Sequence, residues 1–130
     1  MKQITIVLPN RPGVIAHVSE ITAEAGVNIE EIECCVVGEM GVVQMSVDNY
    51  DRAMRALHDA GLQPMSEEVF LVRIDNAPGA LAQVARRFAD AGIDIRSLRI
   101  VRRDPKQAIA AISCSELNKA RALVEDLLVV

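Results

Sequence analysis

The chain carries one sequence motif twice at a constant spacing. Asn10-Arg11-Pro12-Gly13 returns as Asn76-Ala77-Pro78-Gly79, and the offset from Gly13 to Gly79 is 66 residues. The same offset carries Ala25-Gly26 onto Ala91-Gly92, and Arg55-Ala56-Leu57 onto Arg121-Ala122-Leu123, without a gap. A repeat of this length predicts two copies of one compact unit. We place the two domains at residues 1–67 and 68–130.

Size and composition limit what each copy can be. A unit of about 65 residues is near the lower limit for an independent hydrophobic core, so each copy should gain stability by docking against its twin or another chain. Hydrophobic residues make up 51% of the chain but aromatic residues only 2%, which predicts an aliphatic core. The net charge of −4 and the scarcity of aromatic side chains argue against nucleic-acid binding.

We also expect a cytoplasmic protein that does not contact a membrane. No apolar stretch approaches the roughly 20 residues of a membrane span. The apolar run at the N-terminus is too short for a signal peptide.

The hydrophobic periodicity predicts the order β-α-β-β-α-β in each copy. In the first copy a strand at residues 4–8 precedes a helix at 14–25, which should end at a left-handed Gly26. A strand at 28–37, a hairpin turn at 38–41, a strand at 42–47, a helix at 51–60 and a strand at 62–67 follow. The second copy has corresponding strands at 70–74, 94–102 and 108–114, and helices at 80–91 and 117–127. Residues 128–130 either form a short last strand or extend the last helix.

This order predicts an α+β fold of two ferredoxin-like units, each an antiparallel sheet with both helices on one face. The second strand of such a unit lies at the sheet edge, and edges commonly need a partner. Glu30 and Glu33 on one edge correspond to Arg96 and Arg99 on the other. Opposite charges favour pairing of the two edges into a continuous eight-stranded sheet, within one chain or in a homodimer. The alternative is that both edges are solvated.

The repeated motif, together with Asn28-Ile29 at the start of the second strand, resembles ACT domains, which are regulatory modules that often bind amino acids. It is especially similar to the serine-binding regulatory domain of phosphoglycerate dehydrogenase. The resemblance covers nearly the whole chain. It implies a tandem ACT protein that holds a small ligand where two units meet, with contacts from the loop after the first strand and from the start of the second strand.

The resemblance also implies which residues contact the ligand. In the first copy they are Asn10, Arg11, Pro12, Gly13, Val14, Ile15, Asn28 and Ile29. In the second copy they are Asn76, Ala77, Pro78, Gly79, Ala80, Leu81, Asp94 and Ile95. Asp94 replaces Asn28, and its carboxylate would repel a ligand carboxylate. The two sites should therefore not be equivalent.

Elementary chemistry supports a ligand at this junction. Pro12 and Pro78 are expected at the opening of a helix, where a missing N–H costs nothing. The glycine that follows allows a ligand close to the backbone, and free amides at a helix N-terminus favour a carboxylate. The alternative is that the motif only caps the helix and shapes a turn.

Nothing in the sequence predicts catalysis, a cofactor or a metal site. His17 and His58 do not recur in the second copy, and no Ser or Cys has a base at a recognisable spacing. Adjacent strand residues point to opposite faces, so a disulfide between Cys34 and Cys35 is not expected. We expect Cys34, Cys35 and Cys114 to be reduced, core-type thiols.

We therefore expect a non-catalytic regulatory protein that binds an amino acid or a similar ligand and regulates a target enzyme. One alternative is a dedicated regulatory subunit of an amino-acid biosynthetic enzyme. Another is an assembly module with vestigial ligand sites.

Overall fold

The computed structural model describes residues 2–129, which divide into two compact units at residues 67 and 68. Met1 and Val130, the outer ends of the two predicted domains, lie outside the described residues.

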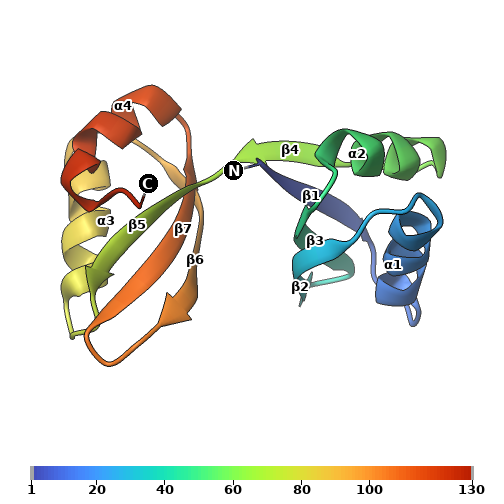
Figure 1. Cartoon of the computed structure of the whole chain (residues 1–130), viewed down its shortest axis with the longest axis horizontal. Coiled ribbons are helices and arrows are strands. Elements are labelled where there is room, and N and C mark those ends of the chain that lie inside the picture. Colours follow the sequence, from blue (N-terminus) through green and yellow to red (C-terminus); the bar gives the residue numbers. More distant parts are fainter. Residues whose placement is uncertain (1, 130) are drawn as a thin grey trace. The chain divides into compact units, whose positions relative to one another are not determined.

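The first unit is a four-stranded sheet with two helices on one face (Figure 1). Its strands lie in the order β2-β3-β1-β4, and β3 runs antiparallel to both β1 and β2. Strand β2 is therefore an edge, as predicted. The elements are β1 (Lys2–Pro9), α1 (Val14–Glu24), β2 (Ile29–Val37), β3 (Met40–Val47), α2 (Tyr50–Asp59) and β4 (Met65–Glu68).

Alternation along the strands separates the two faces of this sheet. Ile4 and Ile6 face the helices with Met45 of the neighbouring strand, and all three are fully buried. Val18 of α1 and Leu57 of α2 complete the same cluster. Because side chains on a strand point alternately to opposite faces, the intervening residues of β1 face away from the helices.

The second unit has three paired strands, in the order β5-β7-β6, with α3 and α4 on one face (Figure 1). The elements are β5 (Phe70–Asp75), α3 (Ala80–Asp90), β6 (Ile95–Arg103), β7 (Gln107–Cys114), α4 (Leu117–Leu123) and the 3-10 turn η1 (Glu125–Leu127). Phe88 of α3 is fully buried and stacks on Phe70, with ring centroids 6.4 Å apart.

The end of the second unit forms a short stub of strand rather than a longer helix. Leu128 makes an isolated antiparallel bridge with Val72, and the Val129 amide donates to the Leu71 carbonyl at 3.0 Å. Helix α4 ends at Leu123, before the predicted residue 127. The paired strands of the described residues thus number four and three, not the four and four that an eight-stranded sheet requires.

Arg87 of α3 holds this C-terminal turn. Its guanidinium donates to both carboxylate oxygens of Asp126, at 2.8 and 3.1 Å, and to the Leu123 carbonyl at 3.3 Å. The hydrogen bonds from Arg87 lower the pKa of the Asp126 carboxyl. The turn is therefore fixed by a bidentate pair that has no equivalent in the first unit, where Ile21 takes the place of Arg87.

One inserted residue changes the offset between the copies, contrary to the predicted gapless repeat. Buried Phe70 pairs with Ile112 as buried Ile4 pairs with Met45, so the offset is 66 on the first strands but 67 on the third. The insertion is Val101, which is skipped where the β6 register shifts between Ile100 and Arg102. Beyond it, buried Leu57 corresponds to buried Val124 rather than to Leu123.

The hairpin turns also differ from the predicted limits. Strands β2 and β3 leave only residues 38–39 between them, because Met40 already pairs with Val37. The helix ends agree with the prediction: Gly26 and Gly92 follow α1 and α3 with φ values of 72° and 70°. A left-handed glycine at this position terminates a helix with little strain.

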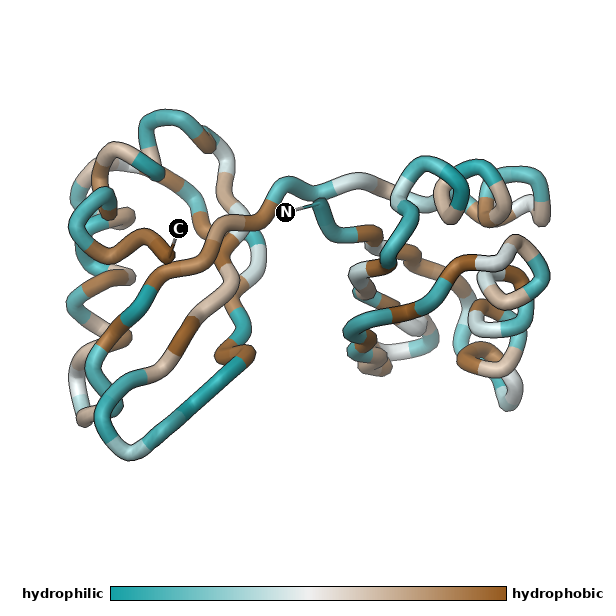
Figure 2. The backbone as a smooth tube through the Cα atoms, in the orientation of Figure 1, coloured by the Kyte–Doolittle hydropathy of each residue, from teal (hydrophilic) through white to brown (hydrophobic). Residues whose placement is uncertain are grey.

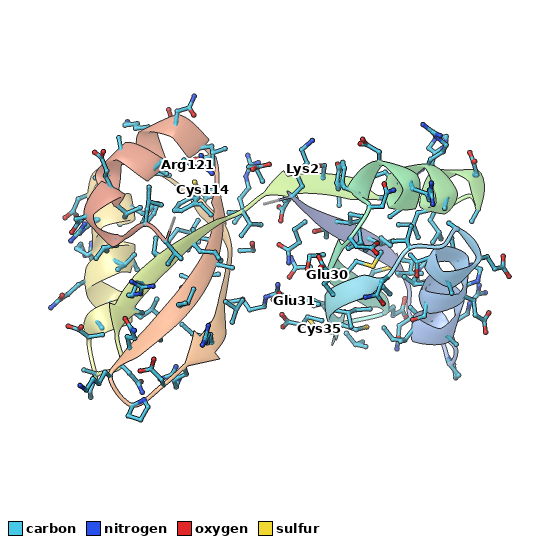
Figure 3. The ribbon with its side chains drawn as sticks, in the orientation of Figure 1. Lys2, Glu30, Glu31, Cys35, Cys114 and Arg121 are labelled. Carbon is cyan, nitrogen blue, oxygen red and sulfur yellow. The ribbon has the colours of Figure 1, made fainter. Side chains whose placement is uncertain are left out.

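The cysteines are free, but two of them do not belong to the core as expected. Cys34 and Cys35 are exposed on the edge strand β2, where the register places them on opposite faces of the sheet. Cys35 projects from β2 on the face away from α1, as does Glu31 (Figure 3). Only Cys114 packs against a core, and desolvation raises the pKa of its thiol.

Candidate functional site

The predicted ligand loops connect β1 to α1 and β5 to α3. Each ends in a left-handed glycine that acts as the N-cap of the helix: Gly13 has a φ of 94° and Gly79 a φ of 87°. A Cβ on either glycine would meet no atom within 4 Å, so the backbone conformation rather than crowding within the chain requires glycine. Pro12 precedes the N-cap and is not the first helical residue, which corrects the prediction for both prolines.

Backbone amides at both helix N-termini remain uncapped. Among the described residues, neither α1 nor α3 has a side-chain hydrogen bond to its first turn. The Val14 amide makes a long turn contact of 3.4 Å to the Arg11 carbonyl. The following amides lie at the positive end of the helix dipole, where a carboxylate would be stabilised. Ile15, with 41% of its surface exposed, offers an apolar contact beside them.

The two loops differ in the state of their asparagine side chains. Both loops are anchored alike, because the Asn10 amide donates to the Glu39 carbonyl and the Asn76 amide donates to the Lys106 carbonyl. The Asn76 side chain donates to the Asp104 carbonyl at 2.7 Å and accepts from Arg103 at 2.6 Å. The exposed Asn10 side chain has no such hydrogen bond within residues 2–129. The first loop therefore keeps an uncommitted amide group that the second loop lacks.

Within one unit, the start of the second strand lies far from the predicted ligand loop. Asn28 lies beyond the C-terminus of α1, whereas Asn10 lies before its N-terminus. The 11 residues of α1 separate them by about 16 Å. The backbone of Asn28 is tied to Asp48, whose carboxylate accepts from the Asn28 amide at 2.9 Å. Asp94 is held in the same way by the Ser115 hydroxyl at 3.1 Å.

The structure thus brings together the predicted residues 10–15 at the N-terminus of α1 and 76–81 at the N-terminus of α3. It leaves 28–29 and 94–95 at the opposite end of each unit. Sequence reasoning missed Arg103 and Asp104, which engage Asn76. A comparison of the two copies gives a weak signal for these two residues. The corresponding residues of the first copy, Val36 and Val37, are apolar, so the polar pair is specific to the second copy.

Other site chemistry is sparse in the part of the chain that the structure describes. It contains no group of three His, Cys, Asp or Glu side chains placed to hold a metal ion. No helix among residues 2–129 is long and apolar enough to cross a membrane. His17 is exposed on α1, and its amide donates to the Gly13 carbonyl as part of the helix.

The fold and the repeated loop agree with a sequence-family match. The model of the ACT domain pair matches residues 1–124. The chain belongs to this family. ACT domains are regulatory modules, so this ACT pair is a small regulatory-type chain with the predicted fold.

Solved structures resemble this ACT pair over nearly its whole length. Protein BT0572 from Bacteroides thetaiotaomicron is 24% identical with a TM-score of 0.79, covering 98% of this chain and 90% of that one. The regulatory subunit of aspartate kinase from Thermus flavus is 21% identical with a TM-score of 0.70, covering 95% and 88%. The corresponding subunit from Thermus thermophilus has the same identity and coverage and a TM-score of 0.66. Among curated proteins, no sequence matches significantly.

Proposed function

We propose that this ACT pair is a non-catalytic regulator that binds a small amino acid between ACT units, with the loop after β1 as its main contact. The uncapped N-terminus of α1 beside the uncommitted Asn10 side chain carries the proposal. The amides would receive the ligand α-carboxylate. An Asn side chain both donates and accepts, which suits a zwitterion.

The distance between Asn10 and Asn28 favours a ligand shared between units. A small amino acid cannot span the length of α1, so a site that uses both residues takes them from different units. The copies differ in this respect, because the first offers Asn28 and the second offers Asp94. Together with the engaged Asn76, this asymmetry favours the first loop as the preferred site.

A thermal-denaturation panel of the twenty amino acids tests the proposal. A ligand at about 100 times its Kd adds about 2.7 kcal/mol to the free energy of unfolding and raises the Tm of a unit of this size by about 10–20 °C. We expect one or a few amino acids to produce this shift. Asn10→Ala should abolish it, because the substitution removes the side chain that pairs with the zwitterion.

Asn76→Ala is the matched control. It removes two hydrogen bonds within the second unit, so it should lower the ligand-free stability by about 1–3 kcal/mol and preserve the ligand shift. A panel without any shift would contradict ligand binding and favour the assembly module. Loss of the shift in Asn76→Ala but not in Asn10→Ala would place the site in the second loop.

A dedicated regulatory subunit is the second candidate. Two structures that match this chain over nearly their whole length are named as regulatory subunits of aspartate kinase, although their identity of 21% supports only the common fold. Affinity capture from the source cell distinguishes the candidates. A subunit would retain one biosynthetic enzyme in stoichiometric amount, whereas a free sensor would not.

We further propose that the acidic edge β2 pairs with a basic edge β6, in a homodimer or within one chain. Both strands are sheet edges, and Glu33 and Arg99 face away from the helices at corresponding register positions. Glu33→Arg should weaken assembly in analytical ultracentrifugation, and Glu33→Arg combined with Arg99→Glu should restore it. Exposed ion pairs contribute only about 0–1 kcal/mol each, so the charges select the partner edge. Unchanged assembly in the single variant would contradict the pairing.

A further inference from the structure

A pocket on the open face of the second sheet, opposite α3 and α4, contains two arginines. It encloses about 170 Å³ and is lined by Arg73, Arg102, Asp104, Gln107 and Ile109. All five residues belong to the second unit and come from the three strands or the β6–β7 turn. Figure 2 shows the tip of this hairpin as a continuous hydrophilic segment.

The strand register places the two arginines on either side of one apolar residue. Arg73 of β5 and Arg102 of β6 both pair with Ile109 of the central strand β7. Adjacent strands lie about 4.8 Å apart, so the two Cα atoms are about 10 Å apart across the row. Two guanidinium groups on long side chains can therefore converge above Ile109. We call these three residues the arginine row.

A bulge at the inserted residue Val101 preserves this arrangement. In a regular strand that included Val101, Arg102 would continue the alternation of Leu98 and Ile100, which face the helices. The bulge shifts the register by one residue, so Arg102 faces the open side. Arg103 then takes the helix side, where it donates to Asn76. Bulges often redirect a side chain beside a functional site.

The first unit shows that the fold does not need this charge. The corresponding row there consists of Val7, Val42 and Cys35. No register shift interrupts β2 at this point. The second unit thus replaces two uncharged positions of one row with arginines while the framework of the sheet stays the same.

The single carboxylate of Asp104 offsets only one of the two guanidinium charges. Its carboxylate accepts the backbone amides of Lys106 and Gln107, at 2.8 and 2.9 Å. These hydrogen bonds lower the pKa of the Asp104 carboxyl, with smaller contributions from the Gln107 side chain and from the charge of Arg102. The carboxylate is thus bonded within the turn, and the pocket keeps an excess of positive charge.

From this geometry we infer a binding site for a small, doubly charged anion at the arginine row. Planar guanidinium groups donate paired hydrogen bonds to carboxylate and phosphate oxygens. Ile109 forms an apolar floor between the two arginines. At about 30 Å³ per water molecule, the pocket holds a ligand of only a few heavy atoms, such as a short dicarboxylate or a phosphate group.

Nuclear magnetic resonance titration of the full chain tests the site, with the amides of Gln107 and Ile109 as reporters. Succinate and inorganic phosphate are the two probes, acetate is the singly charged comparison, and sodium chloride keeps the ionic strength constant. We expect saturable shifts with succinate, phosphate or both, and about tenfold weaker binding of acetate. Saturation by succinate alone identifies a dicarboxylate site, and saturation by phosphate alone identifies a phosphate site.

Charge-neutralising variants show whether the arginine row is responsible. Arg73→Gln and Arg102→Gln should each weaken binding about tenfold or more. Arg121→Gln is the control, because it removes the same charge from the exposed face of α4 (Figure 3). It should leave the affinity unchanged within about twofold. The inference is overturned if neither probe saturates by about 20 mM, or if Arg121→Gln weakens binding as much as Arg102→Gln.

Discussion

Phe88→Ala should unfold the second unit at room temperature or bring it close to unfolding. Phe88 is fully buried, stacks on Phe70 and lies in the middle of the second core. Truncating a buried phenylalanine costs about 3–5 kcal/mol. A unit of this size has a total stability of about 3–9 kcal/mol, at about 0.05–0.15 kcal/mol per residue. One truncation therefore removes a large part of the stability or all of it.

The chain contains a convenient reporter for this experiment. Tyr50 is its single tyrosine, there is no tryptophan, and Tyr50 packs against the first core. In urea denaturation followed by circular dichroism, the Phe88→Ala variant should lower the midpoint of the transition that comes from the second unit. The Tyr50 fluorescence transition should change little, because the two clusters share no residue. Arg86→Ala on the exposed face of the same helix should cost less than about 0.5 kcal/mol. A cost below about 1 kcal/mol for Phe88→Ala would contradict the described core.

Leu57→Ala should cost clearly more than Leu123→Ala, although the repeated Arg-Ala-Leu segment suggests that the two leucines are equivalent. Leu57 is fully buried, so its truncation should cost about 2–5 kcal/mol. Leu123 is only half-buried and lies one position before the fully buried Val124. Its truncation should cost about half as much, because less apolar surface leaves the core.

The free energies of unfolding of both variants come from the same urea experiment. Tyr50 fluorescence follows Leu57→Ala in the first unit, and circular dichroism follows Leu123→Ala in the second. Equal costs would mean that α4 turns the same face to the core as the gapless repeat predicts. The register with Val124 inward would then be wrong.

The amino-acid sequence was sufficient to predict the first strands, the helix ends and the positions of the two loops. Alternation and helical periodicity report burial directly, so Ile4, Ile6, Phe70 and Val72 identified the first strand of each unit. The left-handed glycines that end α1 and α3 were equally predictable, because few other residues adopt that conformation. The family resemblance then located the loops at residues 10–15 and 76–81, which the structure places at the helix N-termini.

The remaining features depend on pairing between distant residues. The matching tripeptides at 55–57 and 121–123 concealed the insertion of Val101, because nothing local marks a bulge in an edge strand. The bond between Arg103 and Asn76 follows from that bulge, so the engaged state of Asn76 could not be predicted either. Cys34 is exposed although its pairing with the buried Val43 places it on the helix face, which the composition of the strand does not reveal.

The bulge at Val101 also bears on how a duplicated protein acquires new chemistry. A single extra codon in a central strand would turn every following side chain to the wrong face of the sheet and ruin the core. In the edge strand β6 one skipped residue absorbs the addition, and the core pairs of β5 and β7 remain in place. Arg102 and Arg103 thus keep the faces of their counterparts Cys35 and Val36, without a cost to packing. A redundant copy with such an edge can be altered by insertion as well as by substitution.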